Sequence, residues 1–229
     1  MVFHQEYDYF TDRGGLSGLF QLMQDIAGSH CGLMGLSAKR LSQDDLMWVV
    51  VRQYAKILRL PMPGERVAAD TWHGGTKHMM FPRYFRVCSA DGELLAEGGA
   101  VWAMVDMNDR KMKNPADYSL ALQSEETGDE PRVQSPVKKL PTTGEAEFTV
   151  PPQYIDLNGH MNNTRYYDAA ESCIAPETAG LSPVEVSTTF IAEVLQGEDM
   201  TIRWGSGDGM WYITGETEKP IFKMNISYK

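Results

Sequence analysis

The chain has 229 residues, of which 42% are hydrophobic and 23% charged, an ordinary composition for one large globular domain or two small ones. Its 31 acidic side chains outnumber the 21 basic ones, and the net charge of −10 disfavours a general nucleic-acid-binding or anionic-membrane surface. No apolar run approaches the roughly 20 residues that span a bilayer, and residues 1–10 do not resemble a signal peptide. We therefore expect a cytoplasmic protein without a membrane span.

The cysteines and histidines suggest neither a disulfide framework nor a metal site. The 3 cysteines (Cys31, Cys88 and Cys173) contain no C-x-x-C pair, which is typical of reduced thiols. The 5 histidines show no H-x-x-x-H or H-E-x-x-H spacing. The glycine-rich segment 205–209 has no helix after it to bind phosphate, so it indicates a hairpin turn. We expect no metal and no nucleotide cofactor.

The first half of the chain predicts one helix followed by a run of strands. After an alternating segment at 3–10, apolar residues recur at helical spacing and form one broad face: Leu16, Leu19, Phe20, Met23, Ile26 and Ala27. Four stretches rich in β-branched or aromatic residues follow, at 48–58, 66–73, 80–88 and 93–106. This order predicts the α+β class, with a curved antiparallel sheet wrapped around the helix.

The second half repeats this order. Between 122 and 146 the composition shifts to Ser, Glu, Thr, Gly, Pro and Lys, which indicates a linker. Beyond it the patterns predict a strand at 147–150, a helix at 162–174 and strands at 184–195, 200–204, 210–216 and 221–228. We therefore expect two units, 1–122 and 146–229, joined by a linker at 123–145.

Two short matches support a duplication of the chain. In the first half a strand runs into Gly64-Glu65 and then into a strand that ends in Trp72. In the second half a strand runs into Gly197-Glu198 and then into a strand that ends in Trp204. Agreement between these matches and the order of the elements makes duplication the better interpretation.

One segment concentrates groups that can carry chemistry. Residues 156–163 read Asp-Leu-Asn-Gly-His-Met-Asn-Asn and follow a strand. If the segment is extended, Asp156, Asn158 and His160 at alternate positions point to one side. The helix that follows offers free backbone N–H groups near Asn162 and Asn163, which can stabilise negative charge on a carbonyl oxygen.

A structural alternative exists for the same residues. Asn158 and Gly159 can form a turn, Asn162 can cap the helix, and His160 can fill space at the helix end. A cap requires a single Asn or Asp, whereas this segment holds five polar groups. The combination therefore favours a catalytic site.

The string DLNGHMNN resembles the D-x-N-x-H-V-N-N signature of hot-dog thioesterases, and its context resembles the acyl-ACP thioesterases of plants and bacteria. The first half is also similar to that family, at 61–65, 71–72, 83–87, 101–102 and 106–110. The resemblance covers nearly the whole chain. It implies two tandem hot-dog units, with one active site in the second unit.

The resemblance also implies residue roles. Besides Asp156, Asn158 and His160, the family takes a catalytic glutamate from a downstream strand, which is Glu193 here. The family often has Cys after this glutamate, whereas this chain has Val194, so a thiol mechanism at that position is excluded. In the first unit, residues 12–16 stand in the place of the signature and lack its Asn and His, which implies a non-catalytic, substrate-binding unit.

Two further residues of the second helix were considered. The resemblance places the family's acidic helix residue at Glu171. Cys173 lies on the apolar side of the predicted helix, where we expect a buried structural thiol rather than a nucleophile.

Two mechanisms fit the same side chains. In the first, Glu193, with its pKa raised by a partly apolar site, takes a proton from water while Asn158 and His160 orient the reactants and Asp156 positions Asn158. In the second, Asp156 attacks the thioester to form an anhydride, as proposed for hydroxybenzoyl-CoA thioesterases. We favour the water mechanism and leave the second open.

The expected substrate is acyl carrier protein with a phosphopantetheine-linked acyl chain. Methionines suit a flexible chain, and Met23, Met34, Met47, Met79 and Met80 are candidates for lining its tunnel, although each is more simply a core residue. Because the carrier protein is acidic, docking requires basic residues, for which the candidates are Arg110, Lys111, Lys113, Lys138 and Lys139.

Other functions remain open. An acyl-CoA thioesterase of the same fold would keep the chemistry and require a pocket for an adenine nucleotide. A non-catalytic acyl-binding sensor would normally carry a DNA-binding or partner module, and the sequence contains no basic helix-turn-helix pattern. A hot-dog dehydratase would not need this signature. The sequence leaves the chain length preference open, and both a monomer and a homodimer are compatible with it.

Overall fold

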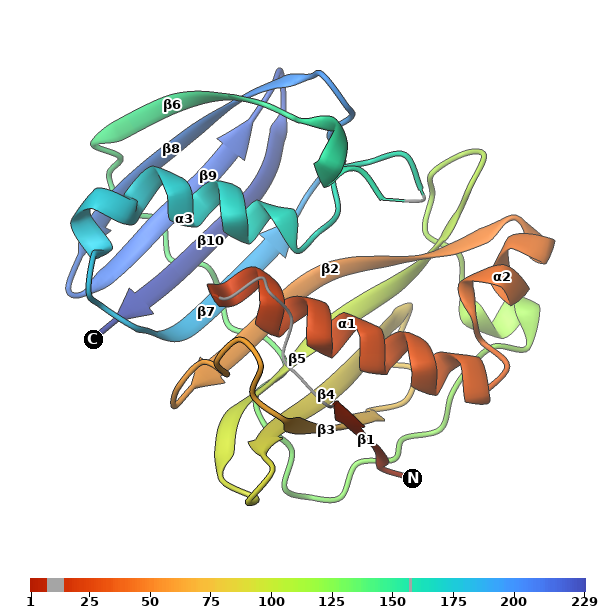
Figure 1. Cartoon of the computed structure of the whole chain (residues 1–229). Helices are drawn as coiled ribbons and strands as arrows, with labels where there is room; N and C mark the ends of the chain where they lie inside the picture. The colour runs from red at the N-terminus through yellow and green to blue at the C-terminus, as the bar shows by residue number, and fades with distance from the viewer. Residues whose placement is uncertain (8–14, 157) are drawn as a thin grey trace.

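The computed structural model describes residues 1–7, 15–156 and 158–229 (Figure 1). The predicted segments 3–10 and 12–16 therefore lie partly outside the described residues. In the first half the elements are β1 (Phe3–Tyr7), α1 (Gly15–Leu33), α2 (Ala38–Leu41), η1 (Ser42–Asp44), β2 (Leu46–Ile57), β3 (Val67–His73), β4 (Met80–Ser89), β5 (Leu94–Asp106) and η2 (Pro115–Tyr118). The short helices α2 and η1 were not predicted.

The second half repeats a strand, a helix and four strands. Its elements are β6 (Gly144–Thr149), η3 (Pro152–Tyr154), α3 (Arg165–Thr178), β7 (Pro183–Phe190), β8 (Asp199–Gly207), β9 (Met210–Glu216) and β10 (Pro220–Tyr228). The segment 119–143 between the halves contains neither helix nor strand.

Within the described residues the strands form one ten-stranded antiparallel sheet in the order β1-β3-β4-β5-β2-β7-β10-β9-β8-β6. The strand order of the second half is that of the first half reversed. Figure 1 shows α1 over the strands of the first half and α3 over those of the second, on the same side of the sheet. This architecture confirms the α+β class with two hot-dog units in tandem. No helix in the described part of the chain is long and apolar enough to cross a membrane.

The two halves are joined through β2 and β7, the central strands of the sheet. Arg52 to Lys56 of β2 pair with Thr189 to Glu185 of β7 in an antiparallel register. Because β2 pairs on its other edge with β5, backbone hydrogen bonds continue from one half into the other. The sheet therefore holds both halves in one fixed relation.

The two repeated Gly-Glu matches form turns of the same construction. The Glu65 side chain accepts a hydrogen bond from the Met62 N–H at 2.8 Å, and the Glu198 side chain accepts one from the Leu195 N–H at 2.8 Å. In both turns the preceding glycine has a positive φ, 81° at Gly64 and 77° at Gly197, which glycine adopts without steric strain. Equivalent turns at equivalent places support duplication of one unit.

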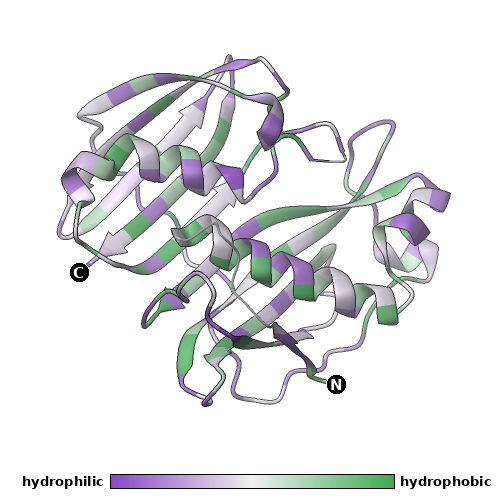
Figure 2. Cartoon of the chain, in the orientation of Figure 1, coloured by the Kyte–Doolittle hydropathy of each residue, from purple (hydrophilic) through white to green (hydrophobic). Residues whose placement is uncertain are grey.

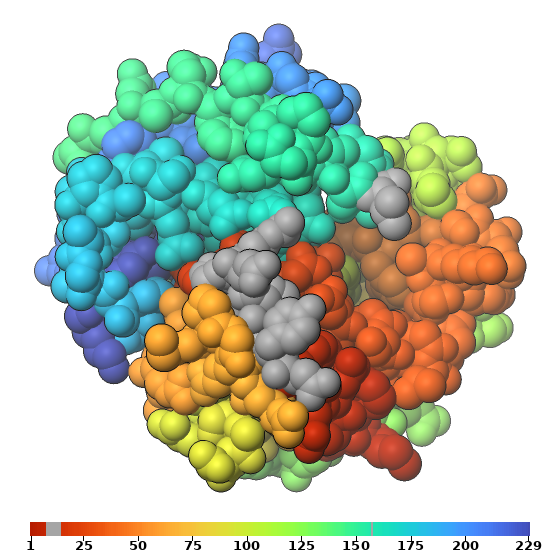
Figure 3. Space-filling model, viewed as in Figure 1, coloured from red at the N-terminus to blue at the C-terminus, as the bar shows by residue number. Residues whose placement is uncertain are grey.

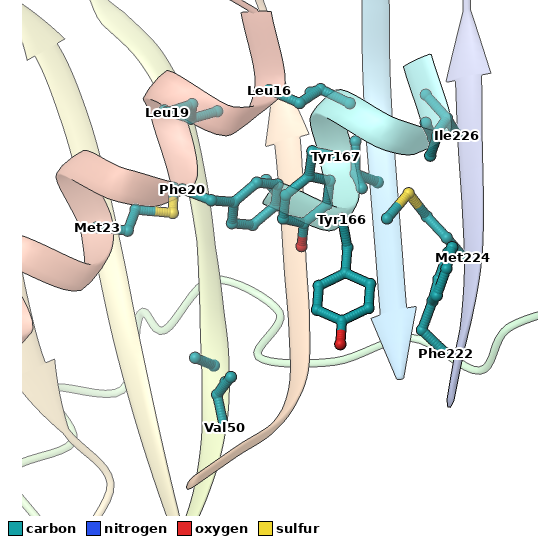
Figure 4. Close-up of a cluster of buried hydrophobic side chains, with 14 of the residues drawn as sticks. Leu16, Leu19, Phe20, Met23, Val50, Tyr166, Tyr167, Phe222, Met224 and Ile226 are labelled. Carbon is teal, nitrogen blue, oxygen red and sulfur yellow. The ribbon is translucent and has the colours of Figure 1, made fainter. Parts of the chain in front are cut away.

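The core lies between the helices and the sheet. Phe20 of α1 stacks on Tyr167 of α3 with ring centroids 4.2 Å apart, and the Tyr167 hydroxyl donates to the Gln53 side chain of β2 at 2.9 Å. Figure 4 shows these rings facing each other between the apolar face of α1 and Met224 and Phe222 of β10. Figure 2 shows hydrophobic residues along α1 and the strands beneath it, and hydrophilic residues at α2. The expected apolar face of α1 is buried in full.

Two of the element boundaries that differ from the prediction affect the site. Helix α3 begins at Arg165 instead of 162, because the Asn162 side chain accepts hydrogen bonds from the N–H and hydroxyl of Thr164 and forms a separate turn. Strand β7 ends at Phe190 instead of 195, because the next two N–H groups both donate to the Ile221 carbonyl and end the ladder. Glu193 therefore lies in a loop and not on a strand.

Candidate active site

The signature segment forms a tight turn and not the extended strand that we expected. The N–H of Asp156 donates to the His160 carbonyl at 2.9 Å, and the Gly159 N–H donates back to the Asp156 carbonyl at 3.1 Å. Gly159 has a φ of 83°, which a residue with a Cβ rarely adopts. The alternating arrangement of Asp156, Asn158 and His160 is therefore wrong: Asp156 bonds to Asn158 within the turn, whereas the His160 ring contacts Glu193.

Asp156 holds Asn158 in place. One oxygen of the Asp156 carboxylate accepts the Asn158 backbone N–H at 2.8 Å, and the other lies 3.4 Å from the Asn158 side-chain amide nitrogen. Both carboxylate oxygens therefore face the same residue. This geometry suits Asp156 for positioning the Asn158 amide, as the water mechanism requires.

Glu193 lies against His160 because the turn and the loop after β7 pair locally. The Met161 N–H donates to the Val194 carbonyl at 3.0 Å, and His160 forms a β-bridge with Leu195. This pairing places a Glu193 carboxylate oxygen in contact with Nε2 of His160. The structure thus brings together the imidazole and the carboxylate that the sequence separated by 33 positions.

The surroundings of Glu193 differ from the partly apolar site that we expected. Its side chain is 41% exposed, and its other carboxylate oxygen lies 3.3 Å from the Arg110 guanidinium. Glu193 therefore lies between an imidazole and a guanidinium and is open to solvent, instead of in an apolar pocket.

Arg110 is the site residue that the sequence reasoning assigned to another role. It comes from the first half, after β5, and its Nη2 lies 3.3 Å from Nε2 of His160. It has a φ of 58° in a turn where the Asp106 side chain accepts the N–H groups of Asn108 and Asp109. We had considered Arg110 only for docking. Segment 106–110, which contains Arg110, is one of the matches to the family, and this match is the sequence signal that could have indicated a role for Arg110 in the site.

Asn162 does not supply the free backbone donor that we expected. Its N–H donates to the Tyr154 carbonyl at 2.8 Å, and it lies before the helix, which begins at Arg165. Its side chain instead orders the turn into α3 through Thr164. Asn163 is half-buried beside it. Among these site residues, the Asn158 amide and the Arg110 guanidinium are groups that could donate hydrogen bonds to a negatively charged oxygen.

Three of these side chains line a groove of about 700 Å³ to which both halves contribute. Arg110 comes from the first half and His160 and Glu193 come from the second, together with Lys219. Figure 3 shows a recess where orange segments of the first half meet teal segments of the second, and Arg110, which lines the groove, is not among the orange residues. A substrate can reach the imidazole from solvent.

A second cavity, of about 370 Å³, lies in the first half under α1. Asn158 lies at this cavity, and so does Met47, whose sulfur lies 3.4 Å from Arg110. Trp48, Phe81 and Trp102 make much of its wall apolar, with the remaining lining from Gln24, Ala27, Gly28, Cys31, Leu36, Ser37, Ala38, His73, Pro82, Arg83 and Leu122. Of the five candidate methionines, Met47 alone is among the residues that line this cavity.

Two titratable residues of α3 lie away from the site. Glu171 accepts the Leu16 N–H at 3.3 Å, at the start of α1, and burial raises the pKa of its carboxyl to about 7. Burial also raises the pKa of the Cys173 thiol, which is half-buried. A raised thiol pKa disfavours the thiolate, which is consistent with a structural role for Cys173.

Comparisons with known proteins agree with this architecture. Among curated relatives, the acyl-[acyl-carrier-protein] hydrolase FATB2 of Cuphea viscosissima is 26% identical over 188 residues, covering 72% of this chain and 45% of that protein. A palmitoyl-acyl carrier protein thioesterase of Cuphea hookeriana is 25% identical with the same coverage. The chain spans about half the length of the curated relatives it matches, 45% for these two.

Solved structures share the fold over the whole chain. An acyl-ACP thioesterase of Bacteroides thetaiotaomicron aligns with a TM-score of 0.84 at 19% identity, over 100% of this chain and 98% of that one. The 12:0-ACP thioesterase of Umbellularia californica aligns with a TM-score of 0.82 at 17% identity, over 100% and 97%. The models for the acyl-ACP thioesterase N-terminal and C-terminal domains match residues 4–121 and 137–228. The chain belongs to the acyl-ACP thioesterase family.

Proposed function

We propose that this chain hydrolyses the thioester of fatty acyl-acyl carrier protein and releases a free fatty acid. The observation that carries this proposal is the contact between His160 and Glu193, held beside Asn158 at the point where the open groove and the apolar cavity lie close together. A thioester needs a base, a carbonyl-orienting group and an oxyanion donor, and these side chains supply all three.

In the proposed reaction, water is the nucleophile. The Glu193 carboxylate removes a proton from the attacking water, while His160 orients the water and the Asn158 amide holds the thioester carbonyl. Negative charge on the carbonyl oxygen is stabilised by that amide and by Arg110. The tetrahedral intermediate then expels the pantetheine thiolate, which takes up the proton. Direct attack by Asp156 is less favourable here because both of its oxygens face Asn158.

We propose that the first unit (1–122) binds the acyl chain and that the second unit (146–229) carries the chemistry, with 123–145 as the linker. The cavity under α1 and the turn at Asp156 support this division. Arg110 is the exception, because it belongs to the first unit and contacts Glu193.

Docking of the acidic carrier protein is proposed at the rim of the groove. Lys111 is exposed next to Arg110, and Lys219 lines the groove. Lys113 is engaged with Asp106 at 3.2 Å. The backbone N–H of Lys138 donates to the Asn225 side chain of β10. Met224 and Ile226, the residues on either side of Asn225, are buried in the core, so the Asn225 side chain and Lys138 lie on the opposite face of the sheet. Lys111 and Lys219 are therefore the stronger candidates.

The compartment and oligomeric state stay predictions. The cytoplasmic location expected from the sequence is one proposal, and the plant relatives are named as chloroplastic. Both a monomer and a homodimer are compatible with the described fold.

The test is hydrolysis of a panel of acyl-ACPs and the matching acyl-CoAs by the purified protein and by Asp156→Ala, His160→Ala and Glu193→Ala. Free acid released chiefly from acyl-ACP, and lost in the three variants, is the expected result. Equal or faster turnover of acyl-CoA would assign the other carrier. No hydrolysis of either by the unsubstituted protein would contradict an enzymatic role and leave acyl binding.

A further inference from the structure

The cavity under α1 contains a buried cation. The Arg83 side chain lines the cavity and is 5% exposed, and it lies on β4 directly opposite His73 on β3. Its Nη1 lies 2.9 Å from Nδ1 of His30 and donates to the Thr71 hydroxyl at 3.2 Å, and its Nη2 lies 3.3 Å from the Cys31 sulfur. A purely hydrocarbon chain would make no use of such a group.

The hydrogen-bond partners of Arg83 are not carboxylates. Burial and the neighbouring guanidinium lower the pKa of His30 to about 4, so this imidazole is neutral at pH 7. Among the described residues no carboxylate oxygen lies within 4 Å of the Arg83 guanidinium; Glu125 instead lies 3.3 Å from His73. A guanidinium has five N–H donors, and the contacts to His30, Thr71 and Cys31 use three. Donors are left for a further acceptor.

Arg83 is far from the catalytic turn. Strand β5 pairs with both residues: its Val105 lies opposite Met47 of β2, and its Ala100 lies opposite Arg83 of β4. Met47 and Arg83 are therefore five residues, or about 16 Å, apart along the sheet. With C–C bonds of about 1.5 Å in a zigzag, an extended acyl chain covers that span in about a dozen carbons. Met47 and Asn158 lie near the chemistry, whereas Arg83, His73 and Cys31 surround the far end.

We propose that Arg83 and His73 form a polar end to the acyl cavity and select acyl chains that carry an oxygen atom, as a hydroxyl, oxo or carboxylate group, near the end distant from the thioester. This inference rests on the proposed function and specifies its substrate class. An oxygen acceptor would bond to the free guanidinium donors, whereas a terminal methyl group would leave those buried donors without an acceptor. The apolar walls at Trp48, Phe81 and Trp102 would hold the methylenes between.

The test compares kcat/KM of the purified protein for dodecanoyl-ACP and tetradecanoyl-ACP with their ω-hydroxy and ω-carboxy counterparts. A hydrogen bond to a charged group in a buried site corresponds to a difference of about tenfold or more in kcat/KM. At one of the two chain lengths we therefore expect kcat/KM for an oxygen-bearing chain to exceed that for the plain chain by at least this factor. Arg83→Met should abolish the preference while plain chains are still hydrolysed. Arg86→Met, which removes a partly exposed arginine of β4 that pairs with Asp129, should retain the preference for oxygen-bearing chains.

Two results would overturn the inference: a preference for the plain chains by the unsubstituted protein, or an unchanged ratio in Arg83→Met. If Arg83→Met fails to fold, the ratio in the unsubstituted protein still decides. Calorimetric binding of ω-hydroxydodecanoic and dodecanoic acids separates this inference from the proposed function. Tighter binding of the hydroxy acid without hydrolysis of any acyl-ACP would contradict the enzymatic role and support the polar end of the cavity. Equal binding of the two acids, together with hydrolysis of acyl-ACP, would support the enzymatic role and contradict the polar end.

Discussion

The two halves of this chain share a strand order and a turn geometry, but they differ in what lies beneath the helix. In the first half, the small residues Ala27 and Gly28 of α1 line a cavity. In the second half, the corresponding helix presents Tyr166 and Tyr167, which are fully buried and fill the space above the sheet. The same scaffold thus leaves a cavity in one half and packs aromatic rings in the other.

The two halves are not independent of each other, because a side chain of each half contacts the other half. Arg110 of the first half contacts Glu193 and His160 of the second. In return, Glu171 of α3 bonds to the first turn of α1. The proposed site is therefore shared by two unequal halves.

The largest expected effect comes from the second half. Glu193→Gln removes the base but keeps a similar shape, and we expect kcat for acyl-ACP hydrolysis to fall by about 10²- to 10⁴-fold. Glu177→Gln, an exposed glutamate near the end of α3, is the matched control and should leave kcat unchanged. Steady-state release of free acid measures both. A loss below fivefold in Glu193→Gln would mean that another group acts as the base.

The stacked pair between the helices is expected to dominate stability. Phe20 is fully buried against Tyr167, so Phe20→Ala should lower the free energy of unfolding by about 3–5 kcal/mol. Phe148→Ala, at a half-buried site on the edge strand β6, should cost about 1–2 kcal/mol. Urea unfolding followed by fluorescence compares the two. Equal losses would show that the contact between halves is not the tighter part of the core.

The contribution of the first half to catalysis is tested at Arg110. Arg110→Gln should lower kcat by about 10²-fold because an oxyanion-stabilising charge is lost, with a smaller change in KM. Lys111→Gln should instead lower kcat/KM modestly and reduce its salt dependence, as a docking residue would. If Arg110→Gln changes KM alone, Arg110 serves docking and not chemistry.

The bond between α3 and α1 predicts a dependence of stability on pH. Burial raises the pKa of Glu171 to about 7, from an ordinary value of 4.5. The folded state therefore holds this proton more tightly than the unfolded chain, so its stabilising contribution is present below pH 4.5 and is lost as the pH rises through 7. A shift of this size corresponds to about 3 kcal/mol.

Glu171→Gln should remove this dependence, because the amide oxygen can still accept the Leu16 N–H without carrying a charge. Urea unfolding between pH 5 and pH 8 should show a decline in stability for the unsubstituted protein and a smaller one for the variant, which should be the more stable of the two at pH 8. Parallel curves would place the titration at another residue.

Much of this organisation was predictable because it depends on local patterns. The helical spacing from Leu16 to Ala27 and the alternating strands fix one buried face each, and their repeated order indicates two units. The resemblance made Asp156, Asn158 and His160 candidates at 156–163, and it made Glu193 a candidate when pattern alone could not. The contact between Glu193 and His160 depends on the β-bridge between His160 and Leu195, and no sequence periodicity predicts that bridge.

The errors have a common physical cause. Side-chain hydrogen bonds compete with regular structure, and sequence periodicity does not register them. Asn162 bonds to Thr164 and delays the helix, and Gly159 with its positive φ turns a predicted strand into a hairpin. The sequence predicts only docking for Arg110 because it is a basic residue in an acidic chain, whereas its contact with Glu193 arises from pairing between distant segments.

The most direct test of the shared site is a double-mutant cycle of Arg110→Gln and Glu193→Gln, measured as kcat/KM for one acyl-ACP. Because the two side chains lie 3.3 Å apart and are proposed to act on one transition state, the double variant should lose little more activity than Glu193→Gln alone. Losses that multiply would mean that the two residues act independently, and they would contradict a single active site built from both halves.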